Sequence, residues 1–208
     1  MDSRERYIRA VTFDSPDRVP IMHCTLKGAW QIHGPALEAL YNRYPSDVLL
    51  SSQTRGPFAF TGSERGHWAD GAVTYDDWGC GWLWNTPEYM GQAVHHPLQD
   101  WRELSSYKSP DPMTGQEGVA LMAEEVSADS HEHFVFVDGG ELFQRMIFLR
   151  GMEEIMLDLH EARDEVFALR DQIMDVCLQR IQYWGKTGVV DGMILRDDWG
   201  TQEALMIR

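Results

Sequence analysis

Short apolar runs alternate with longer amphipathic stretches along most of the chain. The runs with strand character occupy residues 19–23, 48–50, 134–137 and 192–195. Between and around them, apolar residues recur at helical spacing, which predicts helices at 3–13, 35–44, 101–104, 114–128, 141–149, 152–159 and 161–184. Strands that alternate with helices favour parallel strands joined by right-handed crossovers, so the expected fold class is α/β.

Four strands supply about half of a (β/α)₈ TIM barrel, a fold that needs about 250 residues. We therefore interpret the 208 residues as a single domain, 1–208, that forms the N-terminal half of such a barrel, and we expect the sequence to continue past Arg208. Local signals refine the element ends. Ser3 is the expected N-cap of the first helix, Pro20 lies near the start of the first strand, and Gly185 is the expected stop of the longest helix.

Residues 56–94 interrupt this alternation. The stretch is rich in Gly, Trp, Tyr and Asp, and strand alternation recurs at 72–75 and 82–84, which predicts an irregular β-hairpin excursion at one end of the barrel. Four of the eight Trp residues fall here, at Trp68, Trp78, Trp82 and Trp84. Two interpretations stay open: the indoles line a site for a large flat ligand, or they pack the hairpin onto the barrel.

The charge balance excludes several function classes. A formal net charge of −15 argues against binding to nucleic acid or to an anionic membrane, although it leaves room for a local basic pocket. No apolar stretch is long enough to span a membrane, and the charged N-terminus does not resemble a signal peptide, so a cytoplasmic location is expected. The three Cys residues are widely spaced, which predicts reduced thiols rather than a zinc ribbon.

Active sites of TIM barrels gather at the carboxyl ends of the strands, which selects the candidate residues. Asp197 and Asp198 follow the last predicted strand. Because neighbouring strand residues point to opposite sides, one of them is expected to face the barrel mouth, where a carboxylate can orient a substrate hydroxyl or act as a base. We therefore name Asp197 and Asp198 as catalytic candidates. The alternative is a helix N-cap with an ion pair to Arg196.

The other strand ends supply candidate substrate contacts. These are His23, Trp78, Asp138, Glu141 and Trp199. His23 next to Cys24 lacks metal-ligand spacing, so a substrate contact or a hydrogen-bonded His at the rim is expected instead of a metal ligand.

Two further features have a structural interpretation that we prefer. The Gly-rich segment from Asp138 to Glu141 lets a ligand approach the backbone, but a structural turn with a capping Asp is the preferred interpretation. For Arg145 and Arg150, a structural ion pair with Glu153 or Asp77 is preferred to a substrate clamp.

Several short motifs, in this order and spacing, resemble the uroporphyrinogen decarboxylase family across nearly the whole chain. The resemblance implies the TIM barrel of that family. The motifs are Arg4-Glu5-Arg6, Asp17-Arg18-Val19-Pro20, Asp77-Trp78-Gly79, Pro97-Leu98 to Leu104 and Pro110-Asp111, Phe143 with Arg145, Leu149-Arg150-Gly151 and Glu153, and Asp197-Asp198-Trp199-Gly200-Thr201-Gln202.

One departure indicates which branch of the family fits. Porphyrinogen decarboxylases carry an Arg-rich loop after the first strand, whereas residues 23–28 here contain only one basic residue, Lys27. The chain looks more like the branch of corrinoid-dependent methyltransferases, which pass a methyl group from a methyl-corrinoid protein to a thiol or a folate. The resemblance implies zinc, held by a His-x-Cys pair and a distant Cys, and a corrinoid (cobalamin) on a partner protein. In the family those zinc ligands lie in the second half of the barrel, so no metal ligand or cofactor site is expected within residues 1–208.

Two alternatives remain. The first is a metal-independent decarboxylase or lyase of the same fold, in which Asp197 or Asp198 orients the substrate. The second is a non-catalytic half-barrel that acts as a binding module. A half-barrel leaves open sheet edges and a large apolar face, so the chain is expected to form a homo-oligomer.

Overall fold

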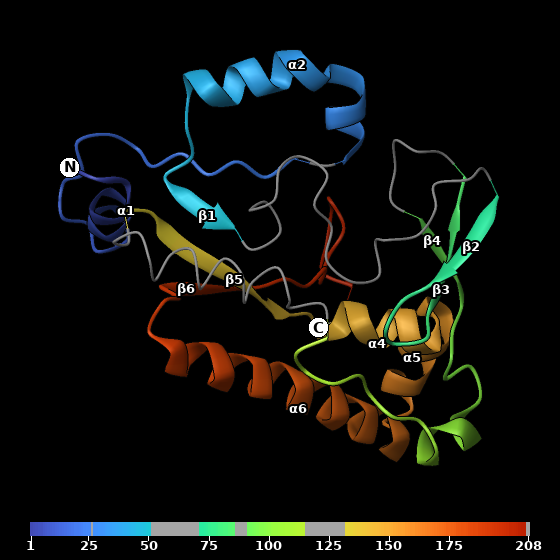
Figure 1. Ribbon diagram of the computed structural model, residues 1–208. Helices are drawn as coiled ribbons and strands as arrows, with labels where there is room; N and C mark the ends of the chain where they lie inside the picture. Colours follow the sequence, from blue (N-terminus) through green and yellow to red (C-terminus); the bar gives the residue numbers. More distant parts are fainter. Residues whose placement is uncertain (26, 51–70, 86–90, 115–131, 207–208) are drawn as a thin grey trace.

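The computed structural model describes residues 1–25, 27–50, 71–85, 91–114 and 132–206, and it has a mixed α/β fold with two small sheets (Figure 1). The helices are α1 (Ser3–Val11), α2 (Lys27–Arg43), α4 (Phe143–Arg150), α5 (Met152–His160) and α6 (Asp164–Thr187), with a 3-10 helix, η2, at Trp101–Ser105. The strands are β1 (Val48–Leu50), β2 (Ala72–Tyr75), β3 (Gly81–Trp84), β4 (Gln92–His95), β5 (Phe134–Gly140) and β6 (Gly192–Leu195).

The first sheet is parallel, with the order β1-β5-β6. This confirms the expected α/β class and the three apolar runs at 48–50, 134–137 and 192–195. The described residues do not show a TIM barrel, because this sheet has three strands and does not close, so the expected half-barrel stays a prediction.

The strand expected at 19–23 is not formed, so this prediction was wrong. The segment has irregular backbone beside the start of β1, where the N–H of Ile21 donates to the carboxylate of Asp47 at 2.7 Å and the carbonyl of Ile21 accepts from the N–H of Asp47 at 2.7 Å. The preceding Pro20 has no N–H to donate. A side chain therefore takes the place of a neighbouring strand.

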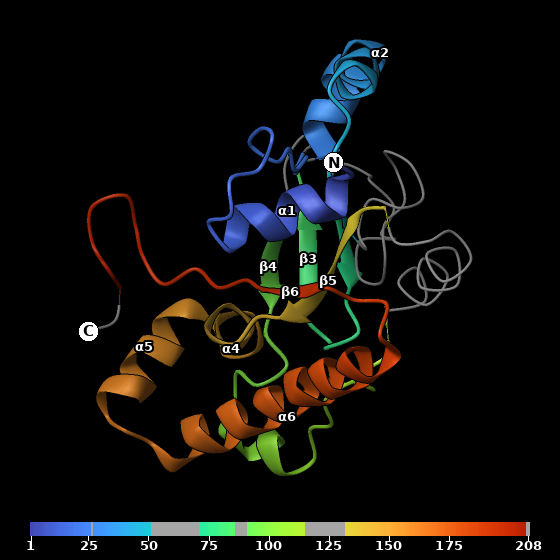
Figure 2. The same cartoon turned by 90° about the vertical axis from the view of Figure 1, so that its left-hand side faces the viewer.

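Alternating residues of β5 face different helices. Phe134 and Phe136 face Tyr7 of α1, with ring centroids 4.3 and 5.5 Å apart, whereas Val135 and Val137 pack with Trp184 of α6. Figure 2 shows α1 and α6 on opposite sides of the parallel sheet. Both faces of β5 are thus covered, as its nearly continuous apolar sequence requires.

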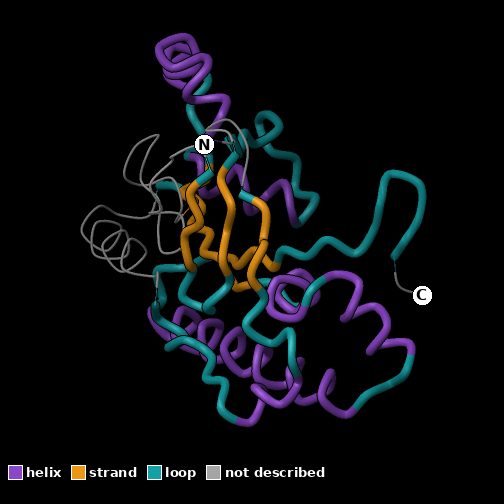
Figure 3. Tube along the Cα trace, turned by 90° about the vertical axis from the view of Figure 1, so that its right-hand side faces the viewer, coloured by secondary structure: helices purple, strands orange, loops and turns teal. Residues whose placement is uncertain are grey.

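The second sheet is antiparallel, with the order β2-β3-β4, and it confirms the expected hairpin at 72–75 and 82–84 while adding β4. A turn from Asp76 to Cys80 joins its first two strands, with Gly79 at φ 80°, a value that favours glycine. The strands of both sheets lie on one side of the layer formed by α4, α5 and α6 (Figure 3).

Carboxylates fasten α1 to the parallel sheet. Asp47 is buried and accepts hydrogen bonds from Arg6 at 2.6 Å, from Arg18 at 2.6 Å and from the hydroxyl of Ser3 at 2.8 Å. Asp191 accepts from Arg4 at 2.6 Å and from the N–H of Val135 at 3.0 Å, so one carboxylate joins α1 to β5.

Several helix ends differ from the expected ones. Asp2, not Ser3, caps α1, because its carboxylate accepts from the N–H of Glu5 at 2.7 Å. The long helix begins at Asp164 and continues past Gly185 to end at Gly188, which adopts the left-handed conformation at φ 71°. The helix expected at 114–128 lies outside the described residues, apart from its first position.

Candidate functional site

The carboxyl ends of β5 and β6 bring Asp138, Glu141 and Asp197 into one region. The two strands stay paired to their ends, since Gly140 aligns with Leu195 and the N–H of Arg196 donates to the carbonyl of Gly140 at 3.1 Å. Gly140 has a φ of 105°, and a Cβ placed there would lie 2.6 Å from the sulfur of Cys177 on α6. Only glycine therefore lets α6 pack this closely under the site.

Asp197 caps α4. Its carboxylate accepts from the N–H groups of Leu142 at 3.2 Å, Phe143 at 2.8 Å and Gln144 at 2.7 Å. These are unsatisfied donors at the positive end of the helix dipole, so the carboxylate stabilises the start of α4. The expected alternative of an N-cap thus describes what Asp197 does, although the helix is α4 and Arg196 pairs with Asp138 at 3.6 Å instead. A catalytic role for Asp197 remains a prediction.

Glu141 is a titratable group whose pKa is altered by its surroundings at this end of the sheet. Its carboxylate accepts from Nη2 of Arg145 at 2.6 Å, and its side chain is 23% exposed. Burial raises the pKa of Glu141, the cation of Arg145 opposes that rise, and the charges of Asp138 and Asp197 add to it. Glu141 therefore keeps its proton to a higher pH than an exposed glutamate does.

Arg145 connects Glu141 to the antiparallel sheet. Its Nη1 donates to Asp76 at 2.9 Å, and its guanidinium lies 5.1 Å from the ring centroid of Trp78 and 5.4 Å from that of Phe148. The expected type of contact, a structural ion pair, is confirmed.

The partners expected for Arg145 and Arg150 were wrong. Arg145 pairs with Asp76 and Glu141, and Arg150 pairs with Asp158 at 2.7 Å, so neither arginine uses Asp77 or Glu153. The sequence does carry a signal for Asp76. It is the first residue of a turn, a position at which Asp commonly accepts N–H bonds from residues further along.

Arg180 was also missed. It projects from α6, and it donates to the carbonyl of Pro112 at 2.6 Å and to that of Thr114 at 3.5 Å. Burial lowers the pKa of Arg180, and the charges of Asp138 and Glu141 act on it in the opposite direction. A partly desolvated cation therefore lies near the two carboxylates. Nothing in the helical pattern of 164–187 distinguishes it from Arg170, the surface arginine of the same helix.

The remaining predicted residues occupy varied positions. His23 lies against α2, where its Nε2 is 2.6 Å from the carbonyl of Tyr44 and its ring stacks on Tyr41 at 3.8 Å. Trp199 is exposed on one side and stacks on Phe143 at 5.3 Å, while Asp198 is exposed. The structure thus places Trp199 beside the capped end of α4, and it places His23 away from any strand end.

The tryptophans of the excursion favour packing where they are described. Trp78 is buried, and its carbonyl accepts from the hydroxyl of Tyr107 at 2.9 Å. Trp82 makes an edge contact with Phe148 of α4 at 4.7 Å. Trp68 and the side chain of Trp84 lie outside the described residues. The substrate contact expected at Trp78 stays a prediction. In the structure, the guanidinium of Arg145 lies over the Trp78 ring.

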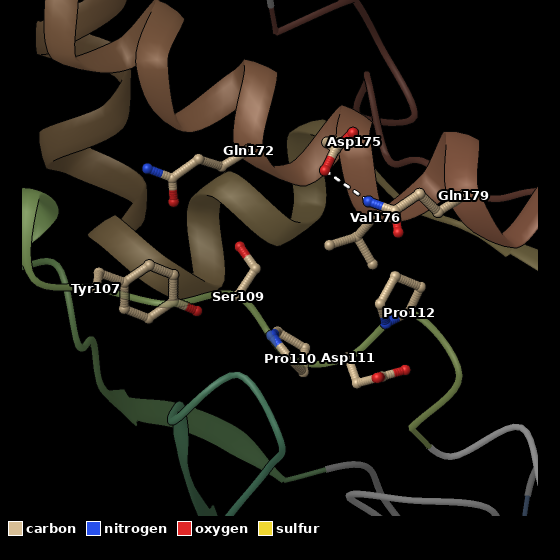
Figure 4. Close-up of a pocket in the computed structure, with 9 residues that line it drawn as sticks. All are labelled: Tyr107, Ser109, Pro110, Asp111, Pro112, Gln172, Asp175, Val176 and Gln179. Atoms are coloured by element: carbon tan, nitrogen blue, oxygen red, sulfur yellow. Dashed lines mark hydrogen bonds between the residues drawn. The ribbon is translucent and has the colours of Figure 1, made fainter.

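A cleft of about 410 Å³ separates residues 107–112 from α6 (Figure 4). Its polar lining comes from Ser109, Asp111, Gln172, Asp175 and Gln179, and the amide of Gln179 donates to Asp175 at 2.6 Å. None of the predicted site residues lines this cleft. The cleft thus lies between this loop and α6, and its lining does not include the residues at the carboxyl end of the sheet.

Zinc does not fit the described part of the chain, where no three His, Cys, Asp or Glu side chains gather around one point. None of the described helices combines the length and apolar character needed to cross a membrane. The chain matches no family model, and no curated protein or solved structure shows significant similarity to it.

Proposed function

We propose that the chain is the N-terminal half of a TIM barrel of the uroporphyrinogen decarboxylase type, and that it takes part in methyl transfer from a methyl-corrinoid protein to a thiol or folate acceptor. The order of the sequence motifs supports the family. The parallel order β1-β5-β6, in which strands neighbour each other as they occur along the chain, is the order of such a barrel. The antiparallel sheet is an insertion between the first two of these strands.

One observation carries the proposed activity: a half-buried Glu141 with a raised pKa lies at the carboxyl end of β5. Methyl transfer to a thiol breaks the cobalt–carbon bond of the donor, whose electron pair stays on cobalt. It also breaks the S–H bond of the acceptor and forms an S–C bond, so a proton must leave the acceptor. The carboxylate of Glu141 accepts that proton. A carboxyl group with a raised pKa is a stronger base than an exposed one and suits operation near neutral pH.

The described residues have further roles in this reaction. Arg145 orients the carboxylate of Glu141, and Asp197 fixes the start of α4 from which Arg145 projects. Zinc, where the family uses it, activates the acceptor as a thiolate. The described residues do not hold it, and the role of Glu141 does not depend on it.

The test uses methylcobalamin as donor and a simple alkyl thiol as acceptor. Loss of the methyl group from cobalt is followed by visible absorbance, and the methylated thiol is identified by mass spectrometry. Glu141→Gln should slow transfer by about 10²-fold, the usual contribution of a general base. Glu153→Gln, a matched change on the exposed face of α5, should leave the rate unchanged. Absence of methylated thiol from the unaltered chain, or equal rates for both variants, would contradict the proposal.

A metal-independent decarboxylase of the same fold is the second candidate, and the protonated form of Glu141 favours it. Loss of CO2 leaves an electron pair on carbon, and Glu141 would donate the proton that this carbon takes up. Asp198 would orient the substrate. Release of CO2 from a carboxylated pyrrole, undiminished by a metal chelator and without methylated thiol in the first assay, would select this reaction.

A further inference from the structure

We infer that Asp76, the first residue of the turn between β2 and β3, governs the charge of Glu141 by sharing Arg145 with it. Asp76 is then a positioning residue for the candidate site, although it lies in a turn of the other sheet. The catalytic meaning of this coupling rests on the proposed function. The coupling itself is a property of three side chains and can be measured without a substrate.

The guanidinium of Arg145 is divided between two carboxylates. Nη1 donates to Asp76 at 2.9 Å and Nη2 donates to Glu141 at 2.6 Å. The side chain of Asp76 is 1% exposed and that of Arg145 is 14% exposed, so solvent screens their interaction weakly. One cation therefore serves two anions in a poorly hydrated place.

The two carboxylates are not equal competitors. Asp76 accepts three further hydrogen bonds, from the N–H of Trp78 at 3.0 Å, the N–H of Cys80 at 2.8 Å and the indole of Trp82 at 3.1 Å. Among the donors that the structure describes, Glu141 has Arg145 alone. Hydrogen bonds to a carboxylate favour its charged form. The charged form of Glu141 therefore depends on its share of Arg145, whereas Asp76 keeps three donors besides that cation.

Charges on every neighbouring element act on Glu141. Asp138 of β5 and Asp197 after β6 disfavour its ionised form, and Arg145 of α4 favours it. Arg180 and the buried thiol of Cys177, both on α6, also lie within electrostatic reach. Asp76 differs from these groups, because it acts on Glu141 through its hydrogen bond to Arg145. Removal of Asp76 therefore changes the pairing of Arg145 with Glu141 and leaves the other neighbours in place.

Two substitutions should move the titration of Glu141 in opposite directions. Asp76→Asn leaves Arg145 with a single anionic partner, which strengthens its pairing with Glu141 and lowers the pKa of Glu141 by about one pH unit. Trp82→Phe removes the indole donor from Asp76, so Asp76 pairs more strongly with Arg145. The pKa of Glu141 then rises, by less than it falls in Asp76→Asn. The phenyl ring keeps the contact with Phe148.

The chain offers a matched control in Asp158. This carboxylate also accepts from an indole, that of Trp101 at 3.0 Å, and from an arginine of α4, Arg150 at 2.7 Å. Asp158→Asn should therefore disturb packing about as much as Asp76→Asn does. It should leave the titration of Glu141 unchanged.

The experiment is a pH titration of the whole chain labelled with carboxyl-13C glutamate, followed by NMR, with the Glu141 signal identified by its loss in Glu141→Gln. A lower midpoint in Asp76→Asn, with an unchanged midpoint in Asp158→Asn, supports the inference. Equal midpoints in the folded unaltered chain and folded Asp76→Asn overturn it, and so does an equal displacement in the control. If Asp76→Asn does not fold, Trp82→Phe decides, because an unchanged or lower midpoint there overturns the inference.

The titration also separates this inference from the proposed function. A displaced midpoint in a chain that transfers no methyl group supports the coupling and removes the proposed activity. Methyl transfer that depends on Glu141, with a midpoint that Asp76→Asn does not move, overturns the coupling and leaves the activity standing.

Discussion

Two buried carboxylates, Asp76 and Asp158, are held by the same pair of residue types and still differ in what they can do. Each accepts from an indole N–H and from an arginine of α4, at distances between 2.7 and 3.1 Å. Both side chains are nearly inaccessible, at 1% and 6% exposure. Burial and pairing alone would give them the same role.

The difference lies in the remaining donors of each arginine. Arg150 directs Nη1 to the carbonyls of Leu98 and Gln99, which do not titrate. Arg145 directs Nη2 to Glu141, which does titrate and is 23% exposed. Through its arginine of α4, the Asp158 network ends in carbonyls, and the Asp76 network ends in a group that can exchange a proton with a bound molecule.

A third buried carboxylate, Asp47, extends the comparison to a case in which two arginines both lie 2.6 Å from the carboxylate. Asp47→Ala should lower the free energy of unfolding most, by about 5 kcal/mol, because Arg6 and Arg18 lose their shared buried partner. Urea denaturation monitored by circular dichroism measures this loss. Asp158 has one arginine at 2.7 Å and a second at 3.6 Å, so a smaller loss for Asp47→Ala than for Asp158→Ala would show that the number of short arginine contacts does not set the effect.

Asp47 should also make the fold sensitive to acid. Burial alone would raise the pKa of Asp47, but hydrogen bonds from Arg18, the N–H of Ile21, Ser3 and Arg6 together hold that pKa below its usual value. The stabilisation is therefore present above the unfolded pKa of about 3.9 and disappears as pH falls through the lower folded value. Asp47→Asn has no titrating carboxylate at position 47, so this part of the acid dependence of stability should be absent in that variant.

Asp76→Ala and Asp158→Ala should lower the free energy of unfolding by similar amounts, about 3 kcal/mol each, because each takes a nearly inaccessible carboxylate away from a buried arginine of α4. Thermal and urea unfolding of the two variants test this equality directly. Equal losses would sharpen the comparison, since any difference between them in the titration of Glu141 could then not be attributed to stability. A much smaller loss for Asp76→Ala would indicate that Arg145 is satisfied by Glu141 alone.

The smallest effect is expected at Asp197, whose carboxylate binds N–H groups rather than an arginine. Asp197→Ala should lower the free energy of unfolding by about 1 kcal/mol, the usual value of a helix cap. Amide hydrogen exchange at Phe143 and Gln144 should accelerate. Asp197→Asn keeps one acceptor oxygen and serves as the control. Unchanged exchange in Asp197→Ala would contradict the capping role.

The sequence predicted the elements of this fold better than it predicted their partners. The apolar run at 134–137 and the alternation at 72–75 and 82–84 became strands, because local pattern and burial agree there. The run at 19–23 did not become a strand, because the N–H of Ile21, the residue after Pro20, donates to the Asp47 side chain instead of to a neighbouring strand. A one-dimensional pattern cannot show that a side chain from elsewhere will take a strand's place.

The candidate site shows the same division. Position at a strand end pointed to Glu141 and Asp197, and both lie at the carboxyl end of the sheet. Their partners lie far along the chain: Asp76 is 69 residues from Arg145, and Asp197 caps a helix 53 to 55 residues before it. Such contacts come from the packing of whole elements. The expectation named Asp77 in place of Asp76, although the first position of the turn favours Asp76 as the acceptor of N–H bonds.

The carboxylate of Asp191 has a consequence for how the chain is made. It anchors Arg4 of α1 and the N–H of Val135 at once, across 187 and 56 residues of sequence. Synthesis proceeds from the N-terminus, so Arg4 leaves the ribosome long before its anchor exists. The attachment of α1 to β5 through Asp191 is therefore completed late, after the contacts that α1 makes with Asp47 can already form.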